Sequence, residues 1–339
     1  MANNSANEGQ SSGGDLVYAC HWSDFSTING VFFLLIFIVS AIGNGLLLCV
    51  LAIYTNLKDV RNIFVLNLAC SDLLFTVTLP FWAVNHLHHW VFRDFVCKFV
   101  TAAYFAGLYS SVIILTAMTV DRFMTVVLRN WPSNCVRRKR CAIGACIAAW
   151  IISVAACLSD AIKTKVENVF GTSDCVPPDE PDVELGYYLQ VSLLFFLPFA
   201  IVIFCYSAIL KTVLQASNRK RYRTVVVVLC IVAAFFICWG PYNILLFIMA
   251  LYTPEGCKAQ ERLDVTLNVS RILAYSHCCM NPLLYMLSQE LRGYLLRLLH
   301  CENVCRKNGG RGNGQNTSVI QNVAFTAQNS AVMLEMHNE

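Results

Sequence analysis

The sequence has little charge. Only 14% of its 339 residues are Asp, Glu, Lys or Arg, whereas 57% are hydrophobic, and the mean hydropathy is +0.55. A soluble domain of this length needs a more charged surface than these residues can provide. The composition therefore excludes an ordinary soluble enzyme or binding domain and indicates a membrane protein.

The sequence also lacks the short motifs that mark common enzyme sites. It contains no GxGxxG or GxxxxGK[ST] phosphate loop, no HExxH, no CxxC pair and no GxSxG. We therefore expect no enzyme activity, no required cofactor and no nucleic-acid partner. A transporter is a distant alternative, because the chain shows no internal repeat with matching broken helices.

A cleavable leader is missing as well. Residues 1–14 are rich in Asn, Ser and Gly and carry neither a basic n-region nor an apolar h-region, so the first hydrophobic segment is expected to insert itself.

Long uncharged runs are what the chain has instead. Each is long enough to cross the membrane as a helix of roughly 20 residues. They lie between Asp24 and Lys58, Arg61 and Arg93, Lys98 and Asp121, Arg140 and Asp160, Glu184 and Lys211, Arg223 and Glu255, and Arg262 and Glu290. The pattern predicts an all-α membrane protein, a seven-transmembrane helix bundle over residues 28–287. An extracellular segment at 1–27 precedes it, and a short amphipathic eighth helix at 288–300 and a disordered cytoplasmic tail at 301–339 follow.

Lys and Arg are concentrated in the segments on one side of these spans. Since cytoplasmic loops hold the excess of positive charge, the N-terminus should be extracellular and the C-terminus cytoplasmic, in a multi-pass protein of the plasma membrane. The outer segments then carry an excess of acid, which favours a basic ligand.

Four of the 17 cysteines fall in outer segments, where the surroundings are oxidising: Cys20, Cys97, Cys175 and Cys257. Four cysteines allow three disulfide pairings. On the inner side, Cys301 and Cys305 follow the amphipathic stretch and are either palmitoylated or unmodified thiols.

One carboxylate lies in the middle of a span. Asp72 needs partners or an ion there, and Ser111, His277 and Asn281 are candidate partners. The group would either hold helices together or form a sodium or proton site. Prolines in three spans, Pro198, Pro241 and Pro282, predict hinges.

Motifs in all seven spans, in order, resemble the rhodopsin-like G-protein-coupled receptors. These are Asn44, Asp72 in Leu-Ala-Cys-Ser-Asp-Leu, Asp121-Arg122-Phe123, Trp150, Pro198, Cys238-Trp239-Gly240-Pro241 and Asn281-Pro282-x-x-Tyr285. Two segments, 78–83 (Thr-Leu-Pro-Phe-Trp-Ala) and 276–282, resemble the chemokine receptors within that family. The runs 239–243 and 271–279 look most like the XC type, since many chemokine receptors carry Glu where this chain has Arg271.

The resemblance implies a conformational switch with no bond chemistry. Its expected partners are a basic extracellular chemokine, a Gi-type heterotrimeric G protein, arrestin and receptor kinases, and membrane lipid. It also implies disulfides Cys97–Cys175 and Cys20–Cys257. The expected ligand-binding residues are Asp15, Tyr18, Trp82, Tyr104, Asp179, Glu180, Asp182, Glu184, Tyr242 and Arg271, although Trp82 and Tyr104 could simply pack between helices. The expected switch and coupling residues are Asp121, Arg122, Tyr206, Trp239, Pro241, Asn281, Pro282 and Tyr285, with a sodium ion as an allosteric modulator at Asp72, Ser111, His277 and Asn281.

One departure from the family concerns its Asp-Arg-Tyr motif, which is Asp121-Arg122-Phe123 in this chain. Only a hydroxyl group is lost, so coupling should survive. A chemokine scavenger that does not signal is the alternative, followed by a receptor for another peptide.

Several modification sites follow from the topology. Asn3 lies in an outer glycosylation sequon, whereas the sequons at Asn268 and Asn316 should match only by chance. Tyr18, near Asp15, is a sulfation candidate. Kinase targets in the tail would be Thr317, Ser318, Thr326 and Ser330, unless the tail is only a solvated linker.

Overall fold

The computed structural model describes residues 25–56, 59–128, 135–169, 171–176, 181–216, 219–251, 256–286, 293–294 and 297–298. The chain divides into two units, Met1–Gln289 and Glu290–Glu339, and the fold below is that of the first. The predicted helix at 288–300 lies mostly outside the described residues, and the predicted tail lies wholly outside them.

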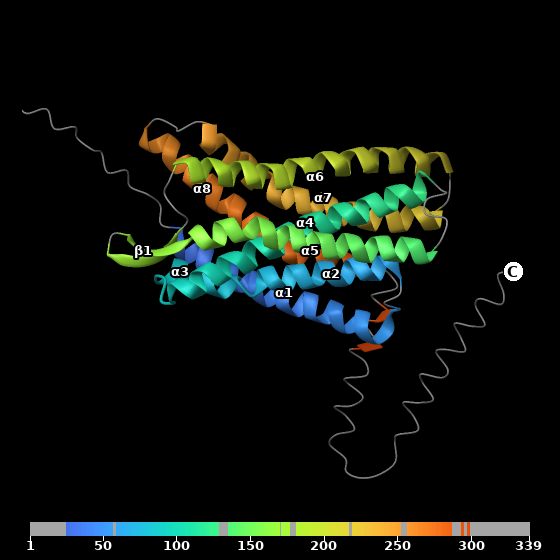
Figure 1. The fold of residues 1–339 in the computed structure, drawn as a ribbon, viewed down its shortest axis with the longest axis horizontal. Helices are drawn as coiled ribbons and strands as arrows, with labels where there is room; N and C mark the ends of the chain where they lie inside the picture. The colour runs from blue at the N-terminus through green and yellow to red at the C-terminus, as the bar shows by residue number, and fades with distance from the viewer. Residues whose placement is uncertain are drawn as a thin grey trace, which may run out of the picture. The chain divides into compact units, whose positions relative to one another are not determined.

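Helices that run side by side make up the first unit (Figure 1). They are α1 (Ser26–Tyr54), α2 (Val60–Thr76), α3 (Leu79–Leu87), α4 (Asp94–Val126), α5 (Cys135–Lys163), α6 (Pro181–Ala216), α7 (Arg219–Leu251), α8 (Cys257–Tyr275) and α9 (His277–Met286). Within the described residues, 6 helical stretches are long and apolar enough to cross a membrane, with α2 and α3 counted as one. The shorter α8 and α9 follow each other as the seventh span, and the predicted seven-helix membrane fold is confirmed.

The helices bury polar groups and expose apolar ones, which is the reverse of a soluble protein. Ile42 on α1 and Ile151 on α5 are 59% and 63% exposed, whereas Asp72 and Ser111 are fully buried. Lipid tails solvate exposed apolar side chains, while polar groups within the membrane must find partners inside the bundle. The interior of this bundle is therefore where binding and switching groups should be sought.

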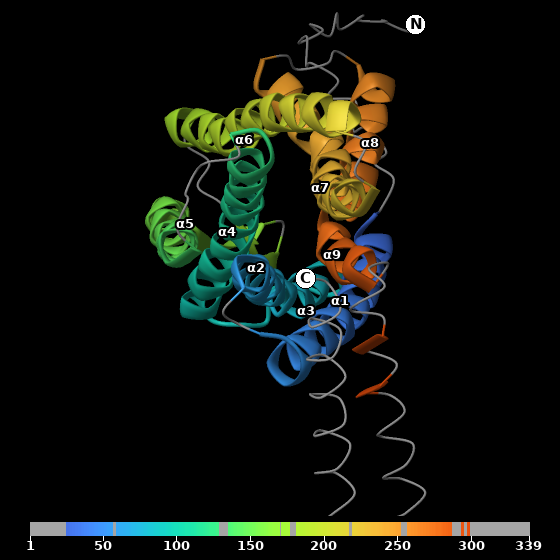
Figure 2. The same cartoon turned by 90° about the vertical axis from the view of Figure 1, so that its right-hand side faces the viewer.

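Helix α4 is the central helix of the bundle, and 78% of its most apolar stretch is buried. Seen end-on, the helices surround a common axis, with α5 outside α4 (Figure 2). Gly107 allows α4 to approach α2 closely, because a Cβ at this position would lie 2.7 Å from the backbone nitrogen of Phe75 and 2.9 Å from the carbonyl oxygen of Ser71. One turn on, Ser110 Oγ donates a hydrogen bond to Ser71 Oγ at 2.8 Å.

Gly107→Ala should therefore destabilise the protein. The added methyl group meets backbone atoms that cannot rotate away, so α2 and α4 must separate at a cost of about 1–3 kcal/mol. Thermal unfolding of the detergent-solubilised protein, followed with a thiol-reactive dye, measures the loss. Gly45→Ala is the matched control, because beyond the adjacent residues and backbone of its own helix no atom of the structure lies within 4 Å of its Cβ position. Equal melting temperatures for the two variants would contradict the prediction.

Helix breaks occur at two places that the sequence did not predict. The second span is interrupted at Val77 and Thr78, just before Pro80, and the seventh is interrupted at Ser276. Helical structure instead continues through Pro198, Pro241 and Pro282, the three predicted hinge positions. Membrane helices tolerate proline because local adjustments satisfy the freed carbonyl groups. At the first break, the Thr78 hydroxyl donates to the carbonyl of Phe75 at 2.7 Å.

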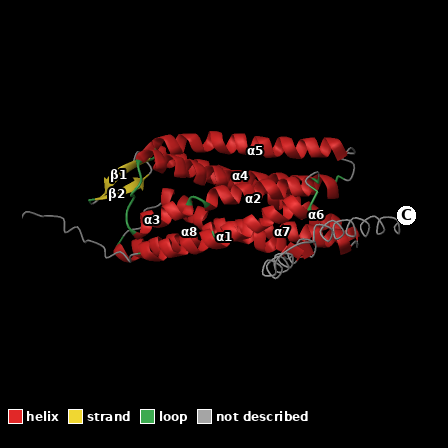
Figure 3. Cartoon of the chain, turned by 90° about the horizontal axis from the view of Figure 1, so that it is seen from below, coloured by secondary structure: helices red, strands yellow, loops and turns green. Residues whose placement is uncertain are grey.

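A β-hairpin caps one end of the bundle. Strands β1 (Lys165–Val169) and β2 (Thr172–Val176) are antiparallel, with Val166 opposite Cys175, and Gly171 has a φ of +90° in the turn between them. Helix α3 and the start of α8 lie at the same end (Figures 1 and 3), which we call the hairpin end.

Candidate functional site

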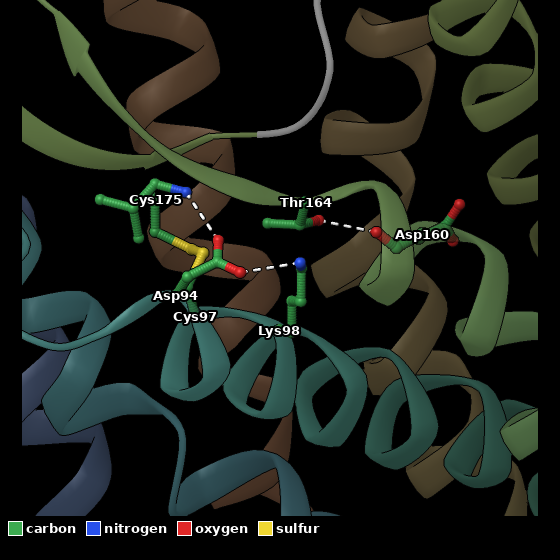
Figure 4. Close-up of a disulfide and its surroundings, with 7 residues drawn as sticks. Asp94, Cys97, Lys98, Asp160, Thr164 and Cys175 are labelled. Carbon is green, nitrogen blue, oxygen red and sulfur yellow. Dashed lines mark hydrogen bonds and ion pairs between the residues drawn. A yellow bond between two sulfur atoms is a disulfide. The ribbon is translucent and has the colours of Figure 1, made fainter.

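The hairpin is fastened to α4 by a disulfide between Cys97 and Cys175. Close by, Asp94 accepts a hydrogen bond from the backbone N–H of Val166 at 3.1 Å and forms an ion pair with Lys98 at 2.7 Å (Figure 4). The predicted Cys97–Cys175 pairing is confirmed. Cys257 is also disulfide-bonded, while its predicted partner Cys20 lies outside the described residues.

An aromatic cluster lies further along α4, about two helical turns beyond this disulfide. Tyr104, two turns from Cys97, contacts Trp82 with ring centroids 6.3 Å apart and Tyr275 with centroids 5.6 Å apart. Trp239 in turn lies 6.0 Å from Tyr242 and 6.2 Å from Tyr275. The structure thus brings the predicted residues together around Tyr275, which the sequence analysis missed. The available signal was its position four residues after Arg271, on the same face of the helix.

Arg271 supplies positive charge to this cluster. It is half-buried and hydrogen-bonds with the side chain of Tyr242. Tyr104 and Tyr275 are near enough to interact with this charge, and Arg271 in turn interacts with the imidazole of His86. The carboxylate of Asp264, on the same helix, accepts a hydrogen bond from Asn268 at 3.1 Å. A guanidinium among phenols, with no carboxylate among these neighbours, is suited to receiving an anionic group.

The fully buried Asp72 lies further into the bundle with its predicted partners around it. Ser111 Oγ donates to Oδ1 at 2.9 Å, Asn281 Nδ2 donates to Oδ2 at 2.7 Å, and His277 Nε2 lies 4.0 Å from Oδ1. His277 Nδ1 is 2.8 Å from the carbonyl oxygen of Ala274. Because a carbonyl only accepts, Nδ1 carries the proton, and Nε2 is left without a hydrogen-bond partner.

These groups fit a small hard cation. The Asp72 carboxylate and the Ser111 hydroxyl offer oxygen ligands, and the unpartnered His277 Nε2 faces them. In the described part of the chain, no group of three or more His, Cys, Asp or Glu side chains could hold a metal ion.

The Asp121-Arg122-Phe123 triplet lies at the end of α4 remote from the hairpin, which we call the far end. Asp121 forms an ion pair with Arg138 of α5, at 2.6 Å. Arg122 acts electrostatically on Tyr206 of α6. The ring of Phe123 packs against that of Phe204 on α6, with the centroids 5.8 Å apart.

Some predicted residues lie outside the described part of the chain: Asn3, Asp15, Tyr18, Cys20, Asp179, Glu180, Cys301 and Cys305. For Asp182, Glu184 and Tyr285, only the helical backbone is described. The sequon at Asn268 is unsuited to glycosylation, because this side chain is buried and donates to the carbonyl of Asp264 at 2.9 Å.

Comparison with known proteins places this architecture in a family. The family described as "7 transmembrane receptor (rhodopsin family)" matches residues 43–285. Chemokine XC receptor 1 of Homo sapiens is 36% identical over 295 residues, covering 84% of this chain and 85% of the relative. The Mus musculus receptor of the same name is 35% identical over 285 residues, covering 84% and 86%. C-C chemokine receptor type 3 of Cavia porcellus is 33% identical over 277 residues, covering 79% and 77%.

Such receptors are not enzymes, as expected for this chain. With its seven spans and the disulfide between α4 and the hairpin, the chain belongs to the chemokine receptors of the rhodopsin family.

Proposed function

We propose that this receptor binds a basic extracellular chemokine of the XC type at the hairpin end and activates a Gi-type G protein at the far end. Calcium mobilisation and chemotaxis would follow, with the protein in the plasma membrane and its N-terminus outside. The observation that carries the proposal is Arg271 among Tyr104, Tyr242 and Tyr275. The similarity to XC receptors from two mammals supports the XC type.

The ligand would engage the receptor in two places. Acidic residues before α1 and near the start of α6 would attract the basic chemokine core, because a surface of one charge sign steers a partner of the opposite sign toward it. These residues are Asp15, Asp179, Glu180, Asp182 and Glu184, joined by Tyr18 if it is sulfated. A flexible segment of the chemokine would then reach Arg271 with an acidic group.

The aromatic cluster provides a route from ligand to switch. Trp239 contacts Tyr275 on one side and lies 5.3 Å from His277 on the other, and His277 faces Asp72. A ligand that favours one arrangement of these rings shifts the equilibrium between inactive and active forms by its differential affinity. The helix segments that would move contain Pro241 in α7 and Asn281, Pro282 and Tyr285 in α9, exposing Arg122 and Tyr206 to the G protein.

Further partners belong to the same proposal. A sodium ion held by Asp72 and Ser111 would restrain the inactive form, with His277 and Asn281 beside it. Receptor kinases and arrestin would act on the tail, and palmitoyl groups at Cys301 and Cys305 would hold it at the lipid surface.

A scavenger that captures chemokine without signalling is the second candidate, favoured by Phe123 in place of tyrosine. Both candidates are tested by measuring the binding of a panel of labelled chemokines to transfected cells together with Gi-linked calcium flux. We expect a basic XC chemokine to bind with nanomolar affinity, on the order of 1–100 nM, and to evoke flux. Binding without flux would favour the scavenger, and binding of no chemokine would refute both.

A further inference from the structure

The ion pair between α4 and α5 at the far end carries a further inference. Arg138, in the first turn of α5, donates from Nε to Asp121 Oδ1 at 2.8 Å and from Nη2 to Oδ2 at 2.6 Å. Both carboxylate oxygens are therefore engaged by one guanidinium in a planar, two-bond pair. The side chains of Arg138 and Asp121 are only 28% and 12% exposed, so water competes little with these bonds.

The pair directs three consecutive residues of α4 to different neighbours. Successive residues on a helix point about 100° apart. Asp121 faces Arg138 on α5, whereas Arg122 acts on Tyr206 and Phe123 packs against Phe204, both on α6. Without Arg138, the poorly exposed carboxylate of Asp121 would need another cation, and its neighbour in the chain, Arg122, carries one.

We propose that Arg138 is a positioning residue for G-protein coupling: by binding both carboxylate oxygens of Asp121 across the α4–α5 interface, it keeps that carboxylate from capturing Arg122 and withholding it from the G protein. This inference rests on the proposed function. Arg138 belongs to none of the motifs by which the sequence resembles the family. The inference therefore gives the first turn of α5 a part in coupling that those motifs do not indicate.

The test compares Arg138→Gln with the parent receptor in membranes supplied with Gi. Chemokine-stimulated nucleotide exchange should fall about fivefold. The number of surface sites and the chemokine affinity, measured with excess GTP so that the G protein is uncoupled, should stay within about twofold of the parent values.

Three further variants are the controls. Arg138→Lys should be intermediate in nucleotide exchange, since an ammonium cannot make the two parallel bonds. Arg122→Ala should abolish exchange and serves as the positive control. Arg140→Gln, an exposed arginine on the same turn of α5, should couple like the parent.

A double-mutant comparison shows whether Arg138 acts through Asp121. In an Asp121→Asn background, Arg138→Gln should have no further effect, because no carboxylate remains to capture Arg122. An equal loss in both backgrounds would mean that Arg138 acts by another route, and the inference would be wrong. Undiminished coupling by Arg138→Gln alone would also overturn it while leaving the proposed function intact. A parent receptor that binds chemokine but activates no G protein would overturn both.

Discussion

Cys97→Ala is expected to abolish chemokine binding at the cell surface. The Cys97–Cys175 bridge closes a loop of sequence separation 78 and fixes β2, and through it the hairpin, to the start of α4. Loss of such a bridge destabilises a fold by ~2–4 kcal/mol. Among the described residues, the hydrogen bonds from Trp90 to Ser173 and from Val166 to Asp94, together with the apolar packing of Val166, would then remain to hold the hairpin near α4. Saturation binding of a labelled chemokine to intact cells, with antibody detection of surface receptor, measures the effect.

Two other cysteine variants are the controls for this experiment. Cys257→Ala should weaken binding without abolishing it, because the second bridge is expected to restrain only the N-terminal segment. Cys49→Ala removes an exposed free thiol and should bind like the parent. If Cys97→Ala and Cys257→Ala lost binding to the same degree, the hairpin would have no special part in forming the binding surface.

The second large effect is expected at Arg271. Arg271→Gln should raise the chemokine concentration for half-maximal calcium flux by about tenfold to a hundredfold, since a hydrogen bond to a charged group contributes roughly 1.5–3 kcal/mol. Chemokine affinity should fall less than potency, because the acidic outer residues would still hold the chemokine core. The probe is the chemokine identified by the binding panel.

Charge reversal distinguishes a ligand contact from a structural role. Arg271→Glu should respond poorly to the natural chemokine and regain potency toward a chemokine variant in which an acid of the flexible segment is replaced by Lys. Arg262→Gln changes an exposed arginine of the same helix and should respond normally. If the chemokine had equal potency at the Arg271→Gln variant and at the parent, Arg271 would not belong to the proposed ligand site.

The sequence predicted the parts of the site that depend on membrane depth. The carboxylate of Asp72 needs hydrogen-bond partners inside the bundle, however the helices are rotated. Few polar groups in the other spans lie at a comparable membrane depth. Ser111 and Asn281 were therefore found as partners before the structure showed their hydrogen bonds. Tyr275 was missed because an aromatic residue in a span is equally compatible with a lipid-facing position.

The amino-acid sequence alone determined the class, the number of spans and the family, because the cost of placing charge in hydrocarbon acts on each segment separately. The tertiary structure decided which faces meet. It paired Asp121 with Arg138 of α5, grouped the phenols around Arg271, and interrupted helices at Thr78 and Ser276 while leaving them continuous at Pro198 and Pro241. Each of these outcomes depends on the rotation and close approach of neighbouring helices, as at Gly107 between α2 and α4. Such contacts join residues far apart in the chain, and no local pattern in the sequence specifies them.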